Sequence, residues 1–136
     1  MDKRSFYVST SVTYKAHTVR GIHFQSGDFA ENKILSVTRG SIFDLVISLD
    51  ESKPLSERIF SFALEEDDGL SLFIPRGFAH GFQALEDNTT VIYGLDSAYN
   101  SQSTRGFSPL SPAIRNLWPH TPINVKPEDL AWPILA

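Results

Sequence analysis

Hydrophobic and polar residues alternate along several short stretches of the chain. In residues 41–49 (SIFDLVISL) the odd positions from Phe43 to Leu49 are apolar, while Asp44 and Ser48 fall on the opposite face. Residues 58–64 (RIFSFAL) repeat the pattern with apolar residues at the even positions. A period of two residues is typical of β-strands that bury one face, so both stretches are predicted to be such strands.

Further strand signals lie before, between and after these two stretches. The predicted strands are residues 5–14, 17–25, 34–38, 70–74, 78–85 and 89–95. Turn-forming residues such as Arg39-Gly40, Asp67-Asp68-Gly69 and Pro75-Arg76-Gly77 separate them. Many short strands at close spacing, with no amphipathic helical period between them, favour an antiparallel barrel or sandwich. We expect an all-β barrel over about residues 5–99.

The last third of the chain has a different character. Most of the eight prolines lie between Pro109 and Pro133, and proline cannot donate a hydrogen bond to a strand ladder. Residues 100–136 are therefore predicted to form an irregular tail, with one short helical turn near residues 126–130. Two tryptophans and the apolar residues near the C-terminus predict that this tail docks on an apolar surface, either the barrel mouth or a partner subunit.

Composition narrows the class of protein. A chain of 136 residues with 41% hydrophobic residues suits one globular domain, residues 1–136. The absence of cysteine excludes disulfides and thiolate nucleophiles. A net charge of −4 argues against nucleic acid as a partner. No apolar run approaches the ~20 residues of a membrane span, and the first residues lack a signal-peptide stretch. A cytoplasmic protein is expected.

Two of the four histidines stand within strand signals. A period of two residues puts His23 on one face with Val19, Gly21 and Gln25, opposite Arg20. A glycine, a histidine and a glutamine on one face suit a wet cavity, although a buried histidine with a single hydrogen bond fits the segment equally well.

The other candidate side chains are more ambiguous on pattern alone. His80 shares a face with two phenylalanines, which is more often the setting of a buried, hydrogen-bonded histidine. Tyr93 is predicted to point inward, where packing is its usual role. Lys33 stands between a polar loop and an apolar strand, a position where lysine is usually solvated. His17 and His120 flank turns or prolines and are expected in solvent.

A metal site is the obvious alternative for a small β-barrel with histidines. No His-x-His or His-x-Glu pair occurs in the chain. His23 and His80 are candidates to be neighbours across the sheet, but two ligands do not complete a mononuclear site. No metal ligand is therefore predicted.

Several segments taken together resemble one family, the dTDP-4-dehydrorhamnose 3,5-epimerases of deoxysugar biosynthesis. The matching segments are RGIHFQ (20–25), Lys33, TRGSIFD (38–44), IPRGFAHGF (74–82), Tyr93 with Tyr99, and DLAWP (129–133). The resemblance implies a cupin fold, a double-stranded β-helix or jelly-roll-like antiparallel barrel. The chain has almost none of the stretch that precedes Phe6 in that family, which leaves the nucleotide and the sugar open.

The resemblance also implies roles for individual residues. His23 would be the general base, held by Asp129, and Tyr93 would be the general acid. Lys33 would neutralise charge on the C4 oxygen of the sugar. The implied substrate-binding residues are Arg20, Gln25, His80 and Tyr99, with Arg20 at the nucleotide diphosphate.

The reaction implied is epimerisation at C3 and C5 of a dTDP-4-keto-6-deoxyhexose. A proton alpha to the ketone is removed and one is returned to the other face, with no cofactor because the ketone is the electron sink. Alternatives are a single-site epimerase or 3,4-ketoisomerase on a related nucleotide sugar, and a non-catalytic sugar-binding cupin. The resemblance further implies a homodimer.

Overall fold

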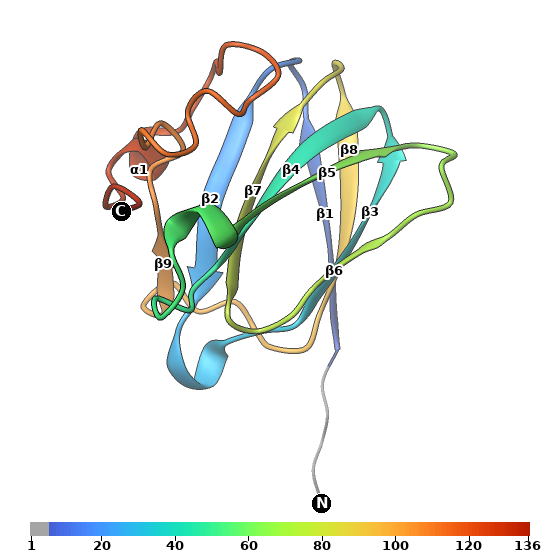
Figure 1. Ribbon diagram of the computed structural model, residues 1–136. Helices are drawn as coiled ribbons and strands as arrows, with labels where there is room; N and C mark the ends of the chain where they lie inside the picture. The colour runs from blue at the N-terminus through green and yellow to red at the C-terminus, as the bar shows by residue number, and fades with distance from the viewer. Residues whose placement is uncertain (1–5) are drawn as a thin grey trace, which may run out of the picture.

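The computed structural model describes residues 6–136, which form a barrel of antiparallel strands with a C-terminal tail laid along one side (Figure 1). The strands and the one α-helix are β1 (Tyr7–Thr13), β2 (Val19–Gln25), β3 (Lys33–Arg39), β4 (Ser41–Ser48), β5 (Ile59–Glu65), β6 (Leu72–Ile74), β7 (Phe78–Ala84), β8 (Thr89–Leu95), β9 (Thr104–Gly106) and α1 (Pro127–Leu130).

The strands form two sheets. The four-stranded sheet has the order β1-β8-β3-β6, and the five-stranded sheet has the order β5-β4-β7-β2-β9. The all-β jelly-roll prediction is confirmed, and each of the eight predicted strands has its counterpart. Ser5, the first residue of the first predicted strand, lies outside the described residues. The short helical turn near residues 126–130 is confirmed as α1, whereas β9 lies in a stretch predicted to be irregular.

One apolar cluster joins the two sheets. It draws residues from β3, β6 and β8 of the four-stranded sheet and from β4, β5 and β7 of the five-stranded sheet. Its buried members are Leu35, Val37, Ile42, Val46, Leu64, Ile74, Phe82 and Val91. Because these side chains fill the space between the sheets, this cluster is the core of the barrel.

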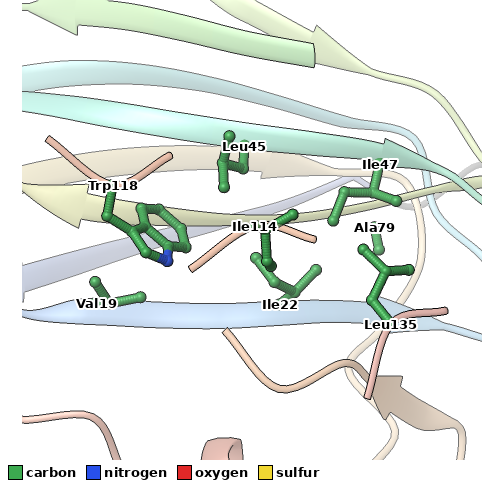
Figure 2. Packing of buried hydrophobic residues seen from close by; sticks show 8 residues of the cluster. All are labelled: Val19, Ile22, Leu45, Ile47, Ala79, Ile114, Trp118 and Leu135. Atoms are coloured by element: carbon green, nitrogen blue, oxygen red, sulfur yellow. The ribbon is translucent and has the colours of Figure 1, made fainter. Parts of the chain in front are cut away.

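A second apolar cluster fixes the tail. Figure 2 shows Val19, Ile22, Leu45, Ile47 and Ala79 of the five-stranded sheet packed against Ile114, Trp118 and Leu135 of the tail. The tail therefore covers the outer face of that sheet. The sequence left two candidates for this docking surface, the barrel mouth and a partner subunit. The barrel mouth was wrong for Ile114, Trp118 and Leu135, which pack on the outer face of the chain's own sheet. Contact of the tail with a partner subunit stays a prediction.

Burial on two sides also changes the expectation for two strands. The apolar face of β4 was predicted correctly, but Asp44 on its other face is fully buried, because that face lines the barrel interior. In β5 the predicted apolar face is only partly covered: Phe60 and Phe62 remain 45% and 40% exposed. β5 is an edge strand, so only β4 packs beside it in the sheet.

A β-bulge in β2 overturns the predicted face of His23. Arg20 pairs with Phe82 and His23 with His80, so two residues of β2 oppose the single residue Gly81. The extra residue turns Arg20 and His23 to the same face and moves Val19 to the other. The prediction that His23 shares a face with Val19 and lies opposite Arg20 was therefore wrong.

Two glycines make this bulge possible. Gly21 has φ +107°, and a Cβ there would lie 2.7 Å from the Cα of Gly81. A Cβ on Gly81 would lie 2.6 Å from the carbonyl oxygen of Arg20. Neither strand could carry a side chain at this crossing without moving away from the other.

Within residues 6–136, no helix has both the length and the apolar character needed to cross a membrane.

Docking of the tail predicts a loss of stability when its buried anchor is truncated. We expect Ile114→Ala to lower the free energy of unfolding by about 2–5 kcal/mol, because a fully buried isoleucine would leave a cavity. Urea unfolding followed by circular dichroism measures this. The matched control is Leu117→Ala, three residues further along the same segment but exposed. Equal effects of the two substitutions would contradict the packing described.

Candidate active site

A cavity of about 170 Å³ opens into the barrel where β2, β3, β7 and β8 meet α1. This is far more space than the ~15 Å³ that one water molecule requires. The polar side chains that line it are Arg20, His23, Lys33, His80, Tyr93, Lys126 and Asp129. The predicted base, acid and lysine therefore share one cavity.

His23 and Asp129 form a direct pair although 106 residues separate them. The Nε2 atom of His23 lies 2.5 Å from Oδ1 of Asp129. The His23 side chain is 41% exposed, whereas Asp129 is buried beneath it. With Nε2 engaged by the carboxylate, Nδ1 is the ring nitrogen left for a ligand.

The local structure of α1 delivers the carboxylate of Asp129. Lys126 caps the helix with an extended backbone, and Pro127 occupies the first turn, where no N–H is needed. The backbone N–H of Gly21 then donates to Oδ2 of Asp129 at 3.3 Å. Burial alone would raise the pKa of Asp129, but the hydrogen bond and charge of His23 and the Gly21 N–H lower it below its usual range.

Tyr93 is partly buried and lines the same cavity. Burial, and secondarily the charge of Asp44, raise the pKa of the Tyr93 phenol above its ordinary value. The hydroxyl therefore keeps its proton at neutral pH and is a donor. The ring also touches the charged part of the site, because the Nζ atom of Lys33 lies 5.4 Å from its centroid.

Lys33 is held inside the barrel by an imidazole and a carboxylate. Its Nζ atom lies 3.1 Å from Nε2 of His80 and 3.5 Å from Oε1 of Glu31. On the far side of the imidazole, Nδ1 of His80 lies 3.1 Å from Oδ2 of Asp44. The chain Asp44–His80–Lys33 thus runs from the buried wall to the cavity.

Electrostatics fix the proton positions in this chain. Burial, and then the charge of Lys33, lower the pKa of His80, so its ring is neutral at neutral pH. A neutral ring donates from Nδ1 to Asp44 and accepts at Nε2 from Lys33. Burial lowers the pKa of Lys33, while the carboxylates of Glu31 and Asp44 raise it and oppose the loss of its proton.

Cations dominate the cavity lining toward the β1–β2 turn. Nε of Arg20 donates to Oγ1 of Thr13 at 2.9 Å, which fixes its guanidinium at the end of β1. Arg20 and Lys126 also line a neighbouring cavity of about 200 Å³, where Lys15 joins them. Two adjoining hollows that share two cations suit an anionic ligand.

The remaining two predicted substrate-binding residues lie apart from this cavity. Gln25 lines a smaller hollow beside His23, and its side-chain amide bonds the backbone of Phe29, Ala98 and Asn100. It therefore ties the β2–β3 and β8–β9 loops together. Tyr99 is 75% exposed and lines none of these three hollows.

Sequence reasoning missed three charged groups of the site: Asp44, Glu31 and Lys126. Asp44 carried a signal, because it stood inside the matching segment 38–44 on a strand whose neighbours are apolar. Glu31 and Lys126 carried none, because both lie in polar stretches that look solvated.

The expectation that His23 and His80 are neighbours across the sheet is confirmed by their pairing in β2 and β7. Over residues 6–136, however, no group of three or more His, Cys, Asp or Glu side chains converges in a way that could hold a metal ion.

Comparison with known proteins gives a consistent picture. The family model described as dTDP-4-dehydrorhamnose 3,5-epimerase matches residues 2–136. The dTDP-4-dehydrorhamnose 3,5-epimerase of Sinorhizobium fredii is 36% identical over 109 residues, which are 80% of this chain and 56% of that protein. The chain thus spans little more than half the length of this curated relative.

Solved structures agree with this similarity. The dTDP-4-dehydrorhamnose 3,5-epimerase of Bacillus anthracis with TDP and PPi bound superposes with a TM-score of 0.89 at 30% identity, covering 98% of this chain and 77% of that one. A 4-keto-6-deoxy sugar epimerase from the novobiocin cluster of Streptomyces spheroides gives a TM-score of 0.82 at 27% identity, covering 96% and 64%.

The environment of Lys33 predicts how its charge responds to a neighbour. Glu31→Gln removes a carboxylate that raises the pKa of Lys33, so we expect that pKa to fall further and the ammonium to be lost at lower pH than in the unchanged protein. Titration of the Lys33 side chain by ¹³C NMR measures the change. Glu51→Gln, an exposed turn position, is the control, and a Lys33 titration unmoved by Glu31→Gln would contradict the ion pair.

Proposed function

The chain belongs to the dTDP-4-dehydrorhamnose 3,5-epimerase family, and on that premise we propose that it epimerises C3 and C5 of a dTDP-4-keto-6-deoxyhexose without a cofactor. One observation carries this proposal: the His23–Asp129 pair, the protonated phenol of Tyr93 and the ammonium of Lys33 all face a single cavity. The reaction requires a base, an acid and a cation around one ring.

In the first step His23 takes the proton from the carbon next to the ketone. Nδ1 is the nitrogen available for this, because Nε2 is bonded to Asp129. The electron pair of the broken C–H bond moves into the ketone and gives an enolate. Asp129 stabilises the imidazolium that forms and keeps the ring in one orientation.

In the second step Tyr93 returns a proton to the opposite face of the same carbon, which inverts its configuration. Because its pKa is raised, the Tyr93 phenol keeps its proton until the basic carbon of the enolate accepts it. The cycle closes when the Tyr93 phenolate takes a proton from solvent and the His23 imidazolium releases one to solvent. Repeating both steps at the second carbon gives the doubly inverted sugar.

The enolate oxygen needs a positive partner, and Lys33 supplies it. Its Nζ atom has His80 and Glu31 as partners within the protein, and a third N–H remains for the ligand. The Lys33 side chain is only 17% exposed. Its ammonium interacts more strongly with a developing oxyanion than a fully exposed one, because less water screens it. His80 then serves the substrate through Lys33.

We assign the diphosphate of the nucleotide to Arg20 and Lys126, toward the neighbouring cavity that Lys15 also lines. The hydrogen bonds that Gln25 makes to backbone groups support a role in shaping the rim rather than direct contact. Tyr99, exposed at the β8–β9 connection, is assigned to the nucleotide end of the ligand.

A second candidate is a related activity in the same cavity, namely a single-site epimerase or a 3,4-ketoisomerase. The similarity to a 4-keto-6-deoxy sugar epimerase from the novobiocin cluster favours keeping it. The same base and acid could act on one carbon or on two, so the site geometry does not distinguish these activities. Analysis of which carbons are inverted in the product sugar separates them. Binding of the nucleotide sugar without any exchange would instead support a sugar-binding cupin.

A second copy of the chain is the proposed partner. The outer face of the four-stranded sheet exposes contiguous apolar side chains, since Ile34 pairs directly with Phe73 and with Gly94, and Gly94 with Val8. Its exposed members are Phe6, Val8, Ile34, Phe73 and Ile92. An apolar patch of this kind is typical of a subunit interface. A cytoplasmic location stays part of this proposal.

The base assignment predicts loss of solvent exchange. Incubated in D₂O with the 4-keto sugar nucleotide, the unchanged protein is expected to incorporate deuterium at C3 and C5. His23→Asn is expected to slow this by about 10²–10⁴-fold, the usual contribution of a positioned base, with nucleotide-sugar binding nearly unchanged. Mass spectrometry and NMR of the recovered sugar measure both positions.

The control for this experiment is His120→Asn, because His120 is exposed and lies outside the cavity. It should exchange at the rate of the unchanged protein. Absence of exchange in folded, unchanged protein with an authentic substrate would contradict the proposed activity.

The proposed dimer face predicts the effect of one charge. Ile34→Glu should weaken self-association by about a hundredfold or more, because it would bury an unpaired carboxylate at the interface. Sedimentation velocity measures the change. Leu110→Glu, an exposed leucine of the tail, should leave association intact, and a monomeric unchanged protein would contradict the interface.

A further inference from the structure

The smaller hollow beside His23 has the size and the lining of a site for one water molecule. Its volume is about 20 Å³, and one ordered water requires ~15 Å³. Polar side chains line much of it, namely His23, Gln25, Glu31, Lys33, Arg76 and His80. An ordered water needs about two to four hydrogen-bond partners, and this lining offers both donors and acceptors.

The hollow adjoins the active-site cavity and also reaches the surface. His23, Lys33 and His80 line both spaces, so a water in the hollow lies beside the proposed base without taking the place of the sugar. Exposed residues, Arg76 and Gly77, line the hollow as well. The hollow therefore extends from the wall of the cavity to solvent.

Glu31 brings a carboxylate to this hollow. Its side chain is only 12% exposed, and its Oε1 atom lies 3.5 Å from Nζ of Lys33. Nε2 of Gln25 donates to Oε2 at 3.4 Å. Because the two oxygens of a carboxylate together accept about four hydrogen bonds, Glu31 keeps capacity for a further donor on the side of the hollow.

The loop that carries Glu31 is fixed on both sides of this residue. The backbone N–H and the side-chain amide of Asn32 donate to the two carboxylate oxygens of Asp96, each at 2.8 Å. Nε of Arg76 donates to the carbonyl oxygen of Ala30 at 3.0 Å. The carboxylate of Glu31 is therefore held in place, as a group that transfers protons requires.

We propose that the hollow binds one water molecule and that Glu31, through this water, carries to solvent the proton that His23 has taken from the sugar. The inference rests on the proposed function, in which His23 must lose that proton before the next cycle. The bound sugar occupies the cavity, so the hollow supplies a separate way out.

The transfer leaves every group as it started. Because Nε2 of His23 is bonded to Asp129, the abstracted proton is on Nδ1. Nδ1 gives it to the water, the water passes one of its own protons to the Glu31 carboxylate, and the carboxyl group releases that proton to solvent. Burial raises the pKa of Glu31 against the opposing charge of Lys33, which helps the carboxylate to accept a proton.

Glu31→Gln tests the transfer, because an amide of the same shape does not take up the proton. The substrate carries deuterium at C3 and C5, and the reaction runs in H₂O. In the unchanged protein His23 exchanges its deuteron, so recovered substrate loses label while product forms. In the variant the deuteron returns to its carbon. The ratio of label lost from recovered substrate to product formed should fall by about a hundredfold, the lower end of what a positioned proton-transfer group contributes.

This ratio separates proton transfer from mere support of Lys33. A weakened ammonium slows exchange and inversion together, because both proceed from the same enolate, and the ratio is then unchanged. Asp96→Asn is the matched control, since it loosens the loop but keeps the Glu31 carboxylate. Its ratio should equal that of the unchanged protein. An unaltered ratio in Glu31→Gln would overturn the proposed transfer.

Glu31→Ala with added formate gives a second readout. Alanine leaves space for a small carboxylate, so formate should restore the ratio in a saturable manner, and chloride at the same ionic strength should not. Failure of formate, or equal restoration by both salts, would contradict the role of the carboxylate.

The water site is tested without turnover in the unchanged protein. A crystal structure that resolves ordered solvent should show one water in the hollow, hydrogen-bonded to Glu31 and to His23. A hollow without this water would overturn the proposal. A protein that holds the water but neither exchanges nor inverts the substrate would refute the proposed function and leave the water site intact.

Discussion

The hydrogen bond between His23 and Asp129 exists because an apolar sheet face must be covered. The outer side of β4, β7 and β2 carries buried aliphatic residues, and the tail supplies the side chains that shield them from water. Covering this face brings α1 against β2 and sets the carboxylate beside the imidazole. Apolar packing thus fixes the position of a proline-rich segment that has few backbone hydrogen bonds to hold it. A change in the packing of the tail would therefore also move the carboxylate that holds His23.

Inside the barrel the same logic applies to charge. Asp44, Lys33 and Glu31 are taken out of water, and each has a partner that offsets the cost of burial. The neutral ring of His80 separates Asp44 from Lys33, so the acid influences the lysine without neutralising it by direct contact. An ammonium with weak competing partners is more useful to a developing oxyanion than one locked in a close ion pair.

The strands and the helical turn of the tail could be predicted because period-two alternation and turn residues are local signals. The motif residues His23, Tyr93, Lys33 and Asp129 were brought to one cavity, as their resemblance to a family implied. The alternation pattern did not predict that Asp44 is buried. The pattern shows which face of a strand is more apolar, but not whether the other face is also buried. The surface on which the tail packs depended on contacts between segments far apart in the sequence, and no local pattern encodes those contacts.

The bulge at Gly21 interrupts the regular alternation of side chains along β2, and the geometry of the site depends on this interruption. In a regular strand, residues three apart point to opposite faces, so Arg20 and His23 could not both reach the cavity. The extra residue opposite Gly81 turns both inward and sends Val19 and Ile22 outward to meet the tail. One irregularity therefore serves the cationic lining, the base and the surface that holds Asp129. A side chain at either glycine would force the strands apart and disturb all three together.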